Sequence, residues 1–416
     1  MKTIHTDVAC TVCGCVCDDL TVTVEGNRVT AVERACRLAE PWFLAPEAPP
    51  EVLCAADGTS VPFDFAVQRA AAILTEAKAP LIYGLSRSTT EGQRAATALA
   101  DRLGAGIDTT AGTGHGPSIV ALQEVGESTC TLGEVKNRAD LVIFWACDPA
   151  TTHPRHLERY SADPVGRFVP EGRKGRHLVV VDRERKATAG FADEFIPVPE
   201  DQNWDALWRL RLLVNGHDCE APQALRDLAE RMKRAKFGIV FFGRSLTVGP
   251  MGHRTVAALL QLTTDLNDFT RFYARRLRRY GDVAGADSVL TWQTGYPFGV
   301  NFARGYPRSN PGEFTGVDLL SRGEVDACVV VGAETVSDFP TAAMDHLRRI
   351  PTIVLDPFAL PPDWSASVRF TTAIYGIHRP GTAYRMDEVP IPLRMLTTSE
   401  APSDAEVLNA ILSAVG

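Results

Sequence analysis

The N-terminal region contains four cysteines whose spacing suits a metal site. Cys10, Cys13 and Cys17 form a Cys-x2-Cys-x3-Cys loop, and Cys36 follows further along the chain. Four thiolates that converge on one small volume can hold a [4Fe–4S] cluster, which needs four soft ligands. Four-cysteine zinc sites use similar loops, and an unfilled pocket of reduced thiols is a third alternative. Cys15 is an additional thiol inside the loop.

The other five cysteines are isolated in the sequence, at Cys54, Cys130, Cys147, Cys219 and Cys328. Cysteines in a chain of this length without an export signal are better explained as ligands or as small buried residues than as a disulfide framework. Two of them, Cys147 and Cys328, adjoin predicted strands, and we expect them in the core.

A glycine-rich stretch, TTAGTGHGPS at residues 109–118, lies before a predicted helix. The backbone N–H groups of such a loop can approach an anionic or phosphorylated ligand closely. A Gly/Pro turn without any ligand is the more common role of such a stretch, and a lone histidine such as His115 is more often structural than catalytic.

A third unusual stretch is WQTGYPFGVNFARGYPRSNPGE at residues 292–313. It is too rich in glycine, proline and aromatic residues for a regular helix, so it predicts a long shaped loop that serves a site or an interface. Its Arg304 and Arg308 could clamp a carboxylate or a pyrophosphate, or could form structural ion pairs.

The elements that must position these residues follow from hydrophobic periodicity. Alternation at residues 20–24 and 29–32 around a Glu-Gly-Asn turn predicts a β-hairpin beside the cysteines. From residue 80 onward, continuous apolar runs alternate with helical stretches, which predicts βαβ units and a parallel sheet covered on both faces. The predicted strands are 81–84, 139–145, 178–182, 237–243, 325–332 and 352–356, with helices at about 90–103 and 255–266.

The order of elements repeats within the chain. Residues 237–266 resemble the first βα unit, 325–332 resemble 139–147, and 352–356 resemble 178–182. Two halves, roughly 79–200 and 237–360, therefore predict a duplicated α/β unit with a cleft between copies, at the carboxyl ends of the strands. We predict three domains, with residues 1–55 as a β lobe that holds the cysteines, and 56–235 and 236–416 as two Rossmann-like lobes.

Composition excludes several classes of protein. The chain has 416 residues, 43 basic and 51 acidic, for a net charge of −8, and its basic residues are scattered. This is a poor footprint for nucleic-acid binding. No apolar run approaches the roughly 20 residues of a membrane helix. The first residues, MKTIHTDVAC, lack an apolar signal core, so we expect a cytoplasmic protein without a membrane partner.

Several segments together resemble one family, the B subunits of formylmethanofuran dehydrogenase, within the molybdopterin oxidoreductase superfamily. The resemblance extends over nearly the whole chain, and implies the α/β fold of formate dehydrogenases without their C-terminal barrel. That fold has a small cysteine-containing N-terminal β lobe and two Rossmann-like, doubly wound parallel-sheet lobes. The segments that carry the resemblance are the cysteine pattern with Asp18-Asp19, WACDP at 145–149, HPRHL at 153–157, TGYPFGVNFARGYPR at 294–308 and GTAYRMD at 381–387.

The resemblance also implies a site. In the family the four cysteines hold a [4Fe–4S] cluster, and a cysteine or selenocysteine directly before His-Gly-Pro-Ser ligates tungsten or molybdenum carried by a bis-pterin cofactor. Here that position is Gly114, which has no side chain to donate. His115 is retained, and Arg304 is the candidate for the family's substrate-side arginine. We therefore expect a degenerate pocket at Gly114, His115 and Arg304, with no catalytic residue and no metal–pterin cofactor.

A version of the family without redox function occurs in the formyltransferase/hydrolase complex of methylotrophic bacteria. There a B-like subunit joins an amidohydrolase-like A subunit, a β-helical C subunit and a formyltransferase D subunit in one-carbon metabolism. The leading hypothesis is that this chain is the scaffold subunit of such a complex, which converts formyl-tetrahydromethanopterin to formate through a formylmethanofuran analogue. The alternatives are an active tungsten or molybdenum dehydrogenase subunit and a metal-binding module at the N-terminus.

Overall fold

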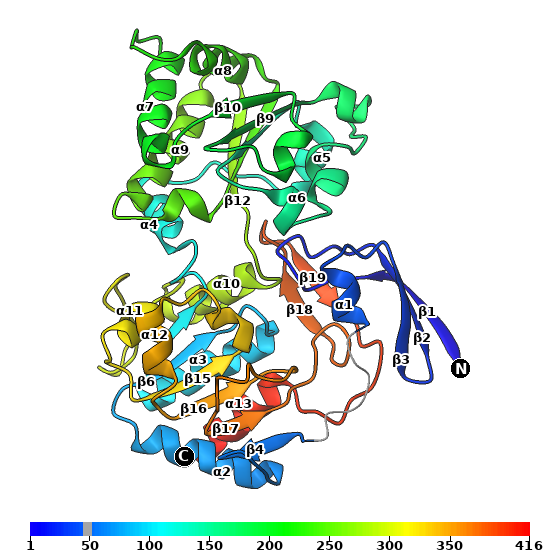
Figure 1. Cartoon of the computed structure of the whole chain (residues 1–416), viewed down its shortest axis with the longest axis vertical. Helices are drawn as coiled ribbons and strands as arrows, with labels where there is room; N and C mark the ends of the chain where they lie inside the picture. The colour runs from blue at the N-terminus through cyan, green and yellow to red at the C-terminus, as the bar shows by residue number, and fades with distance from the viewer. Residues whose placement is uncertain (45–51) are drawn as a thin grey trace. The chain divides into compact units, whose positions relative to one another are not determined.

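The computed structural model describes residues 1–44 and 52–416, which form two compact units. Unit 1 consists of Met1–Thr113 and Tyr280–Gly416, and unit 2 consists of Gly114–Arg279. Figure 1 shows the elements of both units, coloured from blue at the N-terminus to red at the C-terminus.

Unit 1 is built on a nine-stranded sheet with the order β14-β13-β7-β6-β15-β16-β17-β4-β5. The five strands from β7 to β17 run parallel, and the strands at both edges are antiparallel to their neighbours. The strand bounds are β4 Cys54–Ala56, β5 Thr59–Ser60, β6 Pro80–Gly84, β7 Gly106–Thr109, β13 Val300–Asn301, β14 Arg308–Ser309, β15 Ala327–Val331, β16 Thr352–Leu355 and β17 Val368–Phe370.

Helices cover both faces of this sheet. The helices are α1 Ala39–Phe43, α2 Phe63–Glu76, α3 Thr90–Leu103, α10 Val283–Thr294, α11 Gly316–Ser321, α12 Thr341–Leu347 and α13 Asp404–Ala414. Successive residues of β6 enter opposite cores: Ile82 packs in the cluster that includes α2, α3 and α13, whereas Leu81 and Tyr83 pack in the cluster that includes α12. This division explains why β15, with the sequence ACVVV, is apolar at every position.

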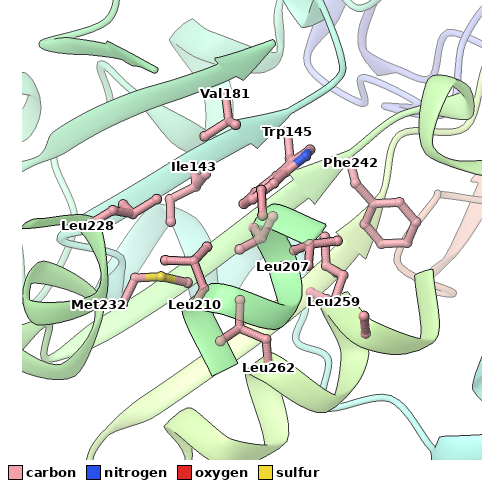
Figure 2. Close-up of a cluster of buried hydrophobic side chains, with 14 of the residues drawn as sticks. Ile143, Trp145, Val181, Leu207, Leu210, Leu228, Met232, Phe242, Leu259 and Leu262 are labelled. Carbon is pink, nitrogen blue, oxygen red and sulfur yellow. The ribbon is translucent and has the colours of Figure 1, made fainter. Parts of the chain in front are cut away.

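Unit 2 contains five parallel strands in the order β10-β9-β8-β11-β12. They are β8 Leu141–Trp145, β9 His177–Asp182, β10 Glu194–Pro197, β11 Phe237–Phe242 and β12 Arg271–Arg276. The helices are α4 Gly116–Val125, α5 Leu132–Arg138, α6 Pro149–Thr152, α7 Asn203–Val214, α8 Gln223–Arg234 and α9 Gly252–Leu266. Figure 2 shows Trp145 of β8 packed among leucines of α7 and α9, and each such side chain stabilises the fold by about 1.5–3 kcal/mol on burial.

The predicted internal repeat reappears as a common strand order. The series β7-β6-β15-β16-β17 in unit 1 matches β12-β11-β8-β9-β10 in unit 2. In this match β6 is equivalent to β11, β15 to β8 and β16 to β9, as the sequence indicated. The two halves exchange strands, however. Among the matched strands, β6 and β7 share a sheet with β15, β16 and β17, and β11 and β12 share a sheet with β8, β9 and β10. The predicted divisions at residues 55 and 235 therefore do not coincide with the edges of the two units.

The predicted hairpin beside the cysteines is confirmed as β2 Leu20–Glu25 and β3 Arg28–Glu33. Gly26 and Asn27 have φ values of 56° and 69°, which is the left-handed geometry of a two-residue hairpin turn. The sequence prediction missed a third strand, β1 Lys2–Val8, which pairs antiparallel with β2. A separate two-stranded sheet contains β18 Gly381–Tyr384 and β19 Pro390–Leu393.

The predicted loop at 292–313 needs one correction. Its first three residues, Trp292–Thr294, form the last turn of α10, which ends at Gly295 with φ 84°. The remainder is a loop that contains the short β13–β14 hairpin. In the described part of the chain, no helix is long and apolar enough to cross a membrane.

Candidate functional site

The predicted ligand cysteines lie at the ends of the N-terminal strands of unit 1. Residues 10–17 form the loop between β1 and β2, and Cys36 follows β3. The loop closes on itself because the Cys10 N–H donates to the Cys17 carbonyl at 2.8 Å. Val16, between two buried cysteines, has φ 36°, which is a costly conformation for a β-branched residue.

Cys13 and Cys17 lie close enough to Cys10 and Cys36 to affect the ionisation of those two thiols. Burial raises the pKa of the Cys10 thiol well above its usual value, and the charges of Cys17 and Cys13 raise it further. Burial also raises the pKa of Cys36, with contributions from the same two neighbours. The fold therefore brings the predicted ligands together, and any metal that binds them must displace protons.

Cys15 is a fifth thiol of this group. Hydrogen bonds with Cys13 and Cys17, together with burial, raise its pKa well above the usual value. Across residues 1–44 and 52–416, no three Cys, His, Asp or Glu side chains are arranged as ligands of a single metal ion. Tetrahedral zinc with Zn–S distances of about 2.3 Å would require sulfur atoms roughly 3.8 Å apart. The metal at Cys10, Cys13, Cys17 and Cys36 therefore stays a prediction.

The glycine-rich loop begins in unit 1, where a buried carboxylate holds it. Asp108, at the carboxyl half of β7, accepts N–H bonds from Thr109 at 2.9 Å, Gly299 at 2.9 Å and Gly316 at 2.7 Å. Burial nevertheless raises the pKa of this carboxyl to about 7. A Cβ at Gly112 would lie 2.1 Å from Asp108 Oδ2, so only glycine fits at that position in the loop.

Gly114 and His115 begin unit 2. The Gly114 carbonyl accepts a hydrogen bond from Thr247 Oγ1 at 2.9 Å. His115 is the N-terminal cap residue of α4, and its carbonyl accepts the Ser118 N–H at 2.9 Å and the Ser118 hydroxyl at 2.6 Å. Both residues are half-buried. The sequence before α4 is therefore fixed through its backbone carbonyls.

Arg304 lies in unit 1, at the exposed turn of the β13–β14 hairpin. Arg308, the other predicted clamp, donates to Asn301 Oδ1 at 3.0 Å and lies over the Phe314 ring at 4.9 Å, which is a structural role. The assignment of Arg304 to the substrate side of the pocket stays a prediction.

Sequence analysis overlooked a group of buried arginines in unit 2. Arg275 and Arg276 end β12, and Arg278 follows it; all three are buried. Arg276 forms a buried ion pair with Glu127 at 2.6 Å and reaches the hydroxyl of Ser118 in the first turn of α4 at 3.5 Å. The available signal was a run of arginines directly after a strand, where open α/β sheets place ligand-binding residues.

The two histidines of the HPRHL segment belong to the core of unit 2. His153 bonds the Arg278 carbonyl through Nε2 at 2.7 Å, and burial lowers its pKa to about 4. His156 packs edge-on against Phe241 with 4.6 Å between ring centroids, and burial lowers its pKa to about 3. Both rings are therefore neutral packing groups at physiological pH.

Unit 1 contains a cavity of about 490 Å³ at the carboxyl ends of β15 and β16. Its walls include the rings of Trp42, Phe358 and Trp364, and Trp42 meets Phe358 edge-on at 5.3 Å. Within residues 1–44 and 52–416, the buried indole N–H groups of Trp42 and Trp364 have no hydrogen-bond partner. A cavity of this size with aromatic walls is typical of a ligand site.

The polar side of this cavity is mainly acidic. Asp356, directly after β16, accepts N–H bonds from Ala333 at 2.6 Å and Phe358 at 2.7 Å, and burial raises its pKa to about 6. Arg87 also lines the cavity, and its guanidinium donates to the carbonyls of Thr11 at 2.7 Å and Val12 at 2.9 Å. One arginine thus joins the cavity to the loop that carries the cysteines.

Unit 2 has a smaller cavity of about 150 Å³ at the corresponding place, where the strand order reverses between β8 and β11. It is lined by Asp182 and Lys186, whose carboxylate and ammonium lie 2.9 Å apart, and by Asn203. Asn203 Oδ1 accepts the Trp145 indole N–H at 2.8 Å. Each unit therefore has a cavity at the carboxyl ends of its parallel strands, where open α/β sheets bind ligands.

Comparison with known proteins identifies full-length relatives. The chain is 39% identical over 427 residues to the B subunit of tungsten-containing formylmethanofuran dehydrogenase 2 from Methanocaldococcus jannaschii, covering 98% of both chains. It is 37% identical to the protein of the same name from Methanococcus maripaludis, with the same coverage. It is 26% identical over 287 residues to the B subunit of the formyltransferase/hydrolase complex Fhc from Methylorubrum extorquens, covering 65% of this chain and 72% of the relative. No family model matches.

Among solved structures, the chain resembles one from the formyltransferase/hydrolase complex (FhcABCD) of Methylorubrum extorquens in complex with methylofuran. The TM-score is 0.73 at 24% identity, with 87% of this chain and 98% of the other covered. This likeness shows the α/β fold, and it agrees with the architecture of the two parallel-sheet units.

Proposed function

Because this chain belongs to the family of formylmethanofuran dehydrogenase B subunits, we propose that it is a family member without redox activity of its own. It serves as the scaffold of a complex that converts formyl-tetrahydromethanopterin to formate through a formylmethanofuran analogue. The single observation that carries the proposal is Gly114, which stands where the family has its metal-binding thiolate.

The sequence His115–Ser118 matches the family's His-Gly-Pro-Ser, which supports Gly114 as the position of the missing ligand. The hydroxyl of Thr247 donates to the Gly114 carbonyl at 2.9 Å, so it is engaged in a hydrogen bond and does not stand as a ligand in place of the thiolate. Cys147 of the same unit turns inward, because its thiol donates to the Phe241 carbonyl at 3.4 Å and burial raises its pKa well above the usual value.

The cavity of each unit has groups that could bind a pterin: Asp356 with the rings of Trp42 and Trp364 in unit 1, and Asp182 with Lys186 in unit 2. A bound tungsten–pterin group supplies oxidoreductase chemistry at its metal. This chain would orient such a group without the thiolate that fixes the metal, so it retains binding surfaces and lacks the reactive centre.

In this proposal the reacting centres lie on partner subunits. Hydrolysis takes place on an amidohydrolase-like A subunit and formyl transfer on a D subunit, with a β-helical C subunit completing the complex. The multisubunit nature of the structurally similar complex supports an assembly of this kind. His115 and Arg304 then remain as parts of a former pocket.

A second candidate function is that of a subunit in an active tungsten-dependent formylmethanofuran dehydrogenase. It is favoured by the relatives at 39% and 37% identity, which are both described as tungsten-containing and are covered over 98% of their length. The relative from the hydrolytic complex is only 26% identical over a shorter region. In this alternative a water molecule or another side chain replaces the thiolate at Gly114.

Cys13 and Cys17 lie close enough to Cys10 and Cys36 to raise the pKa of those two thiols. Four thiolates gathered in one loop region suit a [4Fe–4S] cluster. We propose that a cluster at Cys10, Cys13, Cys17 and Cys36 stabilises the N-terminal β lobe.

Elemental mass spectrometry on the anaerobically purified complex tests the proposal. The expected result is iron near four atoms per chain, as a [4Fe–4S] cluster requires, without tungsten or molybdenum. Tungsten or molybdenum near one per chain would restore the dehydrogenase function. Zinc near one atom per chain would agree with the scaffold function, with a structural zinc ion in place of the iron–sulfur cluster. The same complex should release formate from formyl-tetrahydromethanopterin without an electron acceptor.

A further inference from the structure

We propose that the β-turn at residues 166–169 of unit 2 is a docking surface for another protein subunit, with Phe168 as its apolar anchor. Arg138 and Arg167 flank the anchor and select an acidic partner surface. The inference goes beyond the proposed function, because it applies equally to a transfer complex and to a dehydrogenase.

The turn has a fixed geometry. Gly166 and Val169 exchange two backbone hydrogen bonds of 3.1 Å each, which places Arg167 and Phe168 at the tip. Asn137 at the end of α5 then holds the tip from below: its carbonyl accepts the Phe168 N–H at 2.8 Å, and its Oδ1 accepts the Arg167 N–H at 3.2 Å. The turn is therefore attached to a helix through its own backbone.

Gly166 shows how closely the turn packs on α5. A Cβ at this position would lie 2.2 Å from the Lys136 carbonyl oxygen, which is a backbone atom that cannot move aside. The φ of Gly166 is not in the left-handed region, so close approach alone explains the glycine.

A buried arginine fastens the segment before the turn. The Arg176 guanidinium donates to the carbonyls of Val135 at 3.2 Å, Lys136 at 2.6 Å and Pro164 at 3.0 Å. It therefore satisfies carbonyls at the C-terminal end of α5 and ties them to the approach of the turn. A support this rigid loses little conformational entropy when a partner binds, which favours affinity.

The tip presents apolar surface to solvent. Phe168 is 57% exposed and Val165, on the same approach, is 67% exposed. The Arg138 guanidinium lies 4.5 Å from the Phe168 ring centroid and the Arg167 guanidinium lies 5.7 Å from it. An aromatic ring flanked by arginines is a composition typical of the few residues that dominate binding energy in interfaces.

Charge decides which partner fits. Within residues 1–44 and 52–416, neither Arg138 nor Arg167 has a carboxylate within salt-bridge distance, and Lys136 adds an exposed positive charge beside them. The chain as a whole carries −8, so this basic tip is opposite in sign to the net charge of the chain. The complementary surface is an apolar depression rimmed by Asp or Glu side chains on another subunit.

Site-specific photo-crosslinking tests the contact directly. A photoreactive phenylalanine analogue replaces Phe168 in the chain co-expressed with the other subunits of its complex, and mass spectrometry identifies the linked peptide. We expect a crosslink to a different subunit, in a peptide with carboxylates around apolar residues. A crosslink only to a second copy of this chain, or none in the assembled complex, overturns the proposal.

Two variants measure the strength of the contact. Phe168→Ala should weaken association with the partner by at least about tenfold. Arg167→Glu should also weaken association, and the remaining affinity should depend less on salt concentration. Phe65→Ala is the matched control, because Phe65 is 56% exposed and lies in unit 1. The thermal midpoint of the isolated chain should be unchanged in all three. Wild-type affinity in both test variants contradicts the inference, and the metal content of the complex is unaffected by either result.

Discussion

The carboxylate of Asp108 accepts the backbone N–H of Gly316 at 2.7 Å, although the two residues are 208 positions apart in the chain. The same carboxylate accepts N–H groups from Gly299 and Thr109. One buried side chain therefore fixes the start of the glycine-rich loop and both ends of the long loop between α10 and α11.

Replacing this carboxylate with an amide should destabilise unit 1. In an Asp108→Asn variant, the amide N–H₂ group faces at least one backbone N–H, and a buried donor left without a partner costs about 1–3 kcal/mol. Chemical denaturation of the isolated chain measures the loss. A free energy of unfolding equal to that of the wild type would show that the three hydrogen bonds are replaceable.

The same residue makes stability depend on pH. The folded-state pKa of Asp108 is about 7, above an unfolded value of about 3.9. Between these values the folded state binds more protons than the unfolded state. The contribution of this group is therefore fully present below pH of about 4, falls as pH rises, and levels off above pH of about 7. Denaturation from pH 4.5 to 8 should show the wild type losing stability relative to Asp108→Asn; parallel curves would contradict the shift.

Gly112→Ala tests the close approach of the loop to Asp108. The new Cβ would lie 2.1 Å from Asp108 Oδ2, and overpacking of this kind typically costs about 1–3 kcal/mol. Gly190→Ala is the control, because no atom lies within 4 Å of its Cβ and its φ is not left-handed. The first variant should lower the thermal midpoint and the second should not. Equal midpoints would mean that the loop moves aside freely.

Removing one partner of the Arg276–Glu127 ion pair should lower the free energy of unfolding far more than removing both partners. The side chains are 8% and 7% exposed, so Arg276→Met leaves Glu127 as a buried, uncompensated charge at a cost of about 3–5 kcal/mol. The double variant Arg276→Met/Glu127→Gln should recover much of that loss. The free energies of unfolding of the wild type, both single variants and the double variant give the coupling energy of the pair. If the effects of the two single variants simply add, the predicted coupling is wrong.

Restoring the thiolate should restore metal binding if the clefts are intact. A Gly114→Cys variant, produced with tungstate in a host that makes the pterin cofactor, should gain tungsten toward one atom per chain. Gly114→Ala is the control, since its methyl group cannot coordinate a metal and should gain no tungsten. Elemental analysis distinguishes them. Equal tungsten in the wild type and Gly114→Cys would contradict the assignment of Gly114 as the missing ligand.

Cys13→Ser should weaken assembly without changing hydrolysis. Loss of one of four ligands should release the metal and lower the yield of assembled complex, whereas formate release per assembled complex should match the wild type. Cys219→Ser, at an isolated thiol in unit 2, is the control. An unchanged yield of complex from Cys13→Ser would mean that the cysteine group is a relic.

Local patterns in the sequence were sufficient for the individual elements. The hairpin of β2 and β3 and the strands β6, β8, β9, β11 and β16 follow from periodicity, turn residues and apolar runs, which depend only on neighbouring residues. The correspondence between halves was also visible, because equivalent strands keep equivalent composition. The cysteine spacing at residues 10–17 was enough to predict a metal site, and the glycine at 114 was enough to predict the loss of the family's metal-binding thiolate.

The tertiary structure decided which strands share a sheet and which charges are buried. β6 pairs with β15 rather than with β8, a choice set by edge-to-edge contacts between segments more than 200 residues apart. Arg276 is buried beside Glu127 and Arg304 is exposed, although both are arginines in Arg-rich stretches. Hydrogen bonds, ion pairs and desolvation depend on neighbours in space, and those neighbours are fixed only when distant parts of the chain pack together.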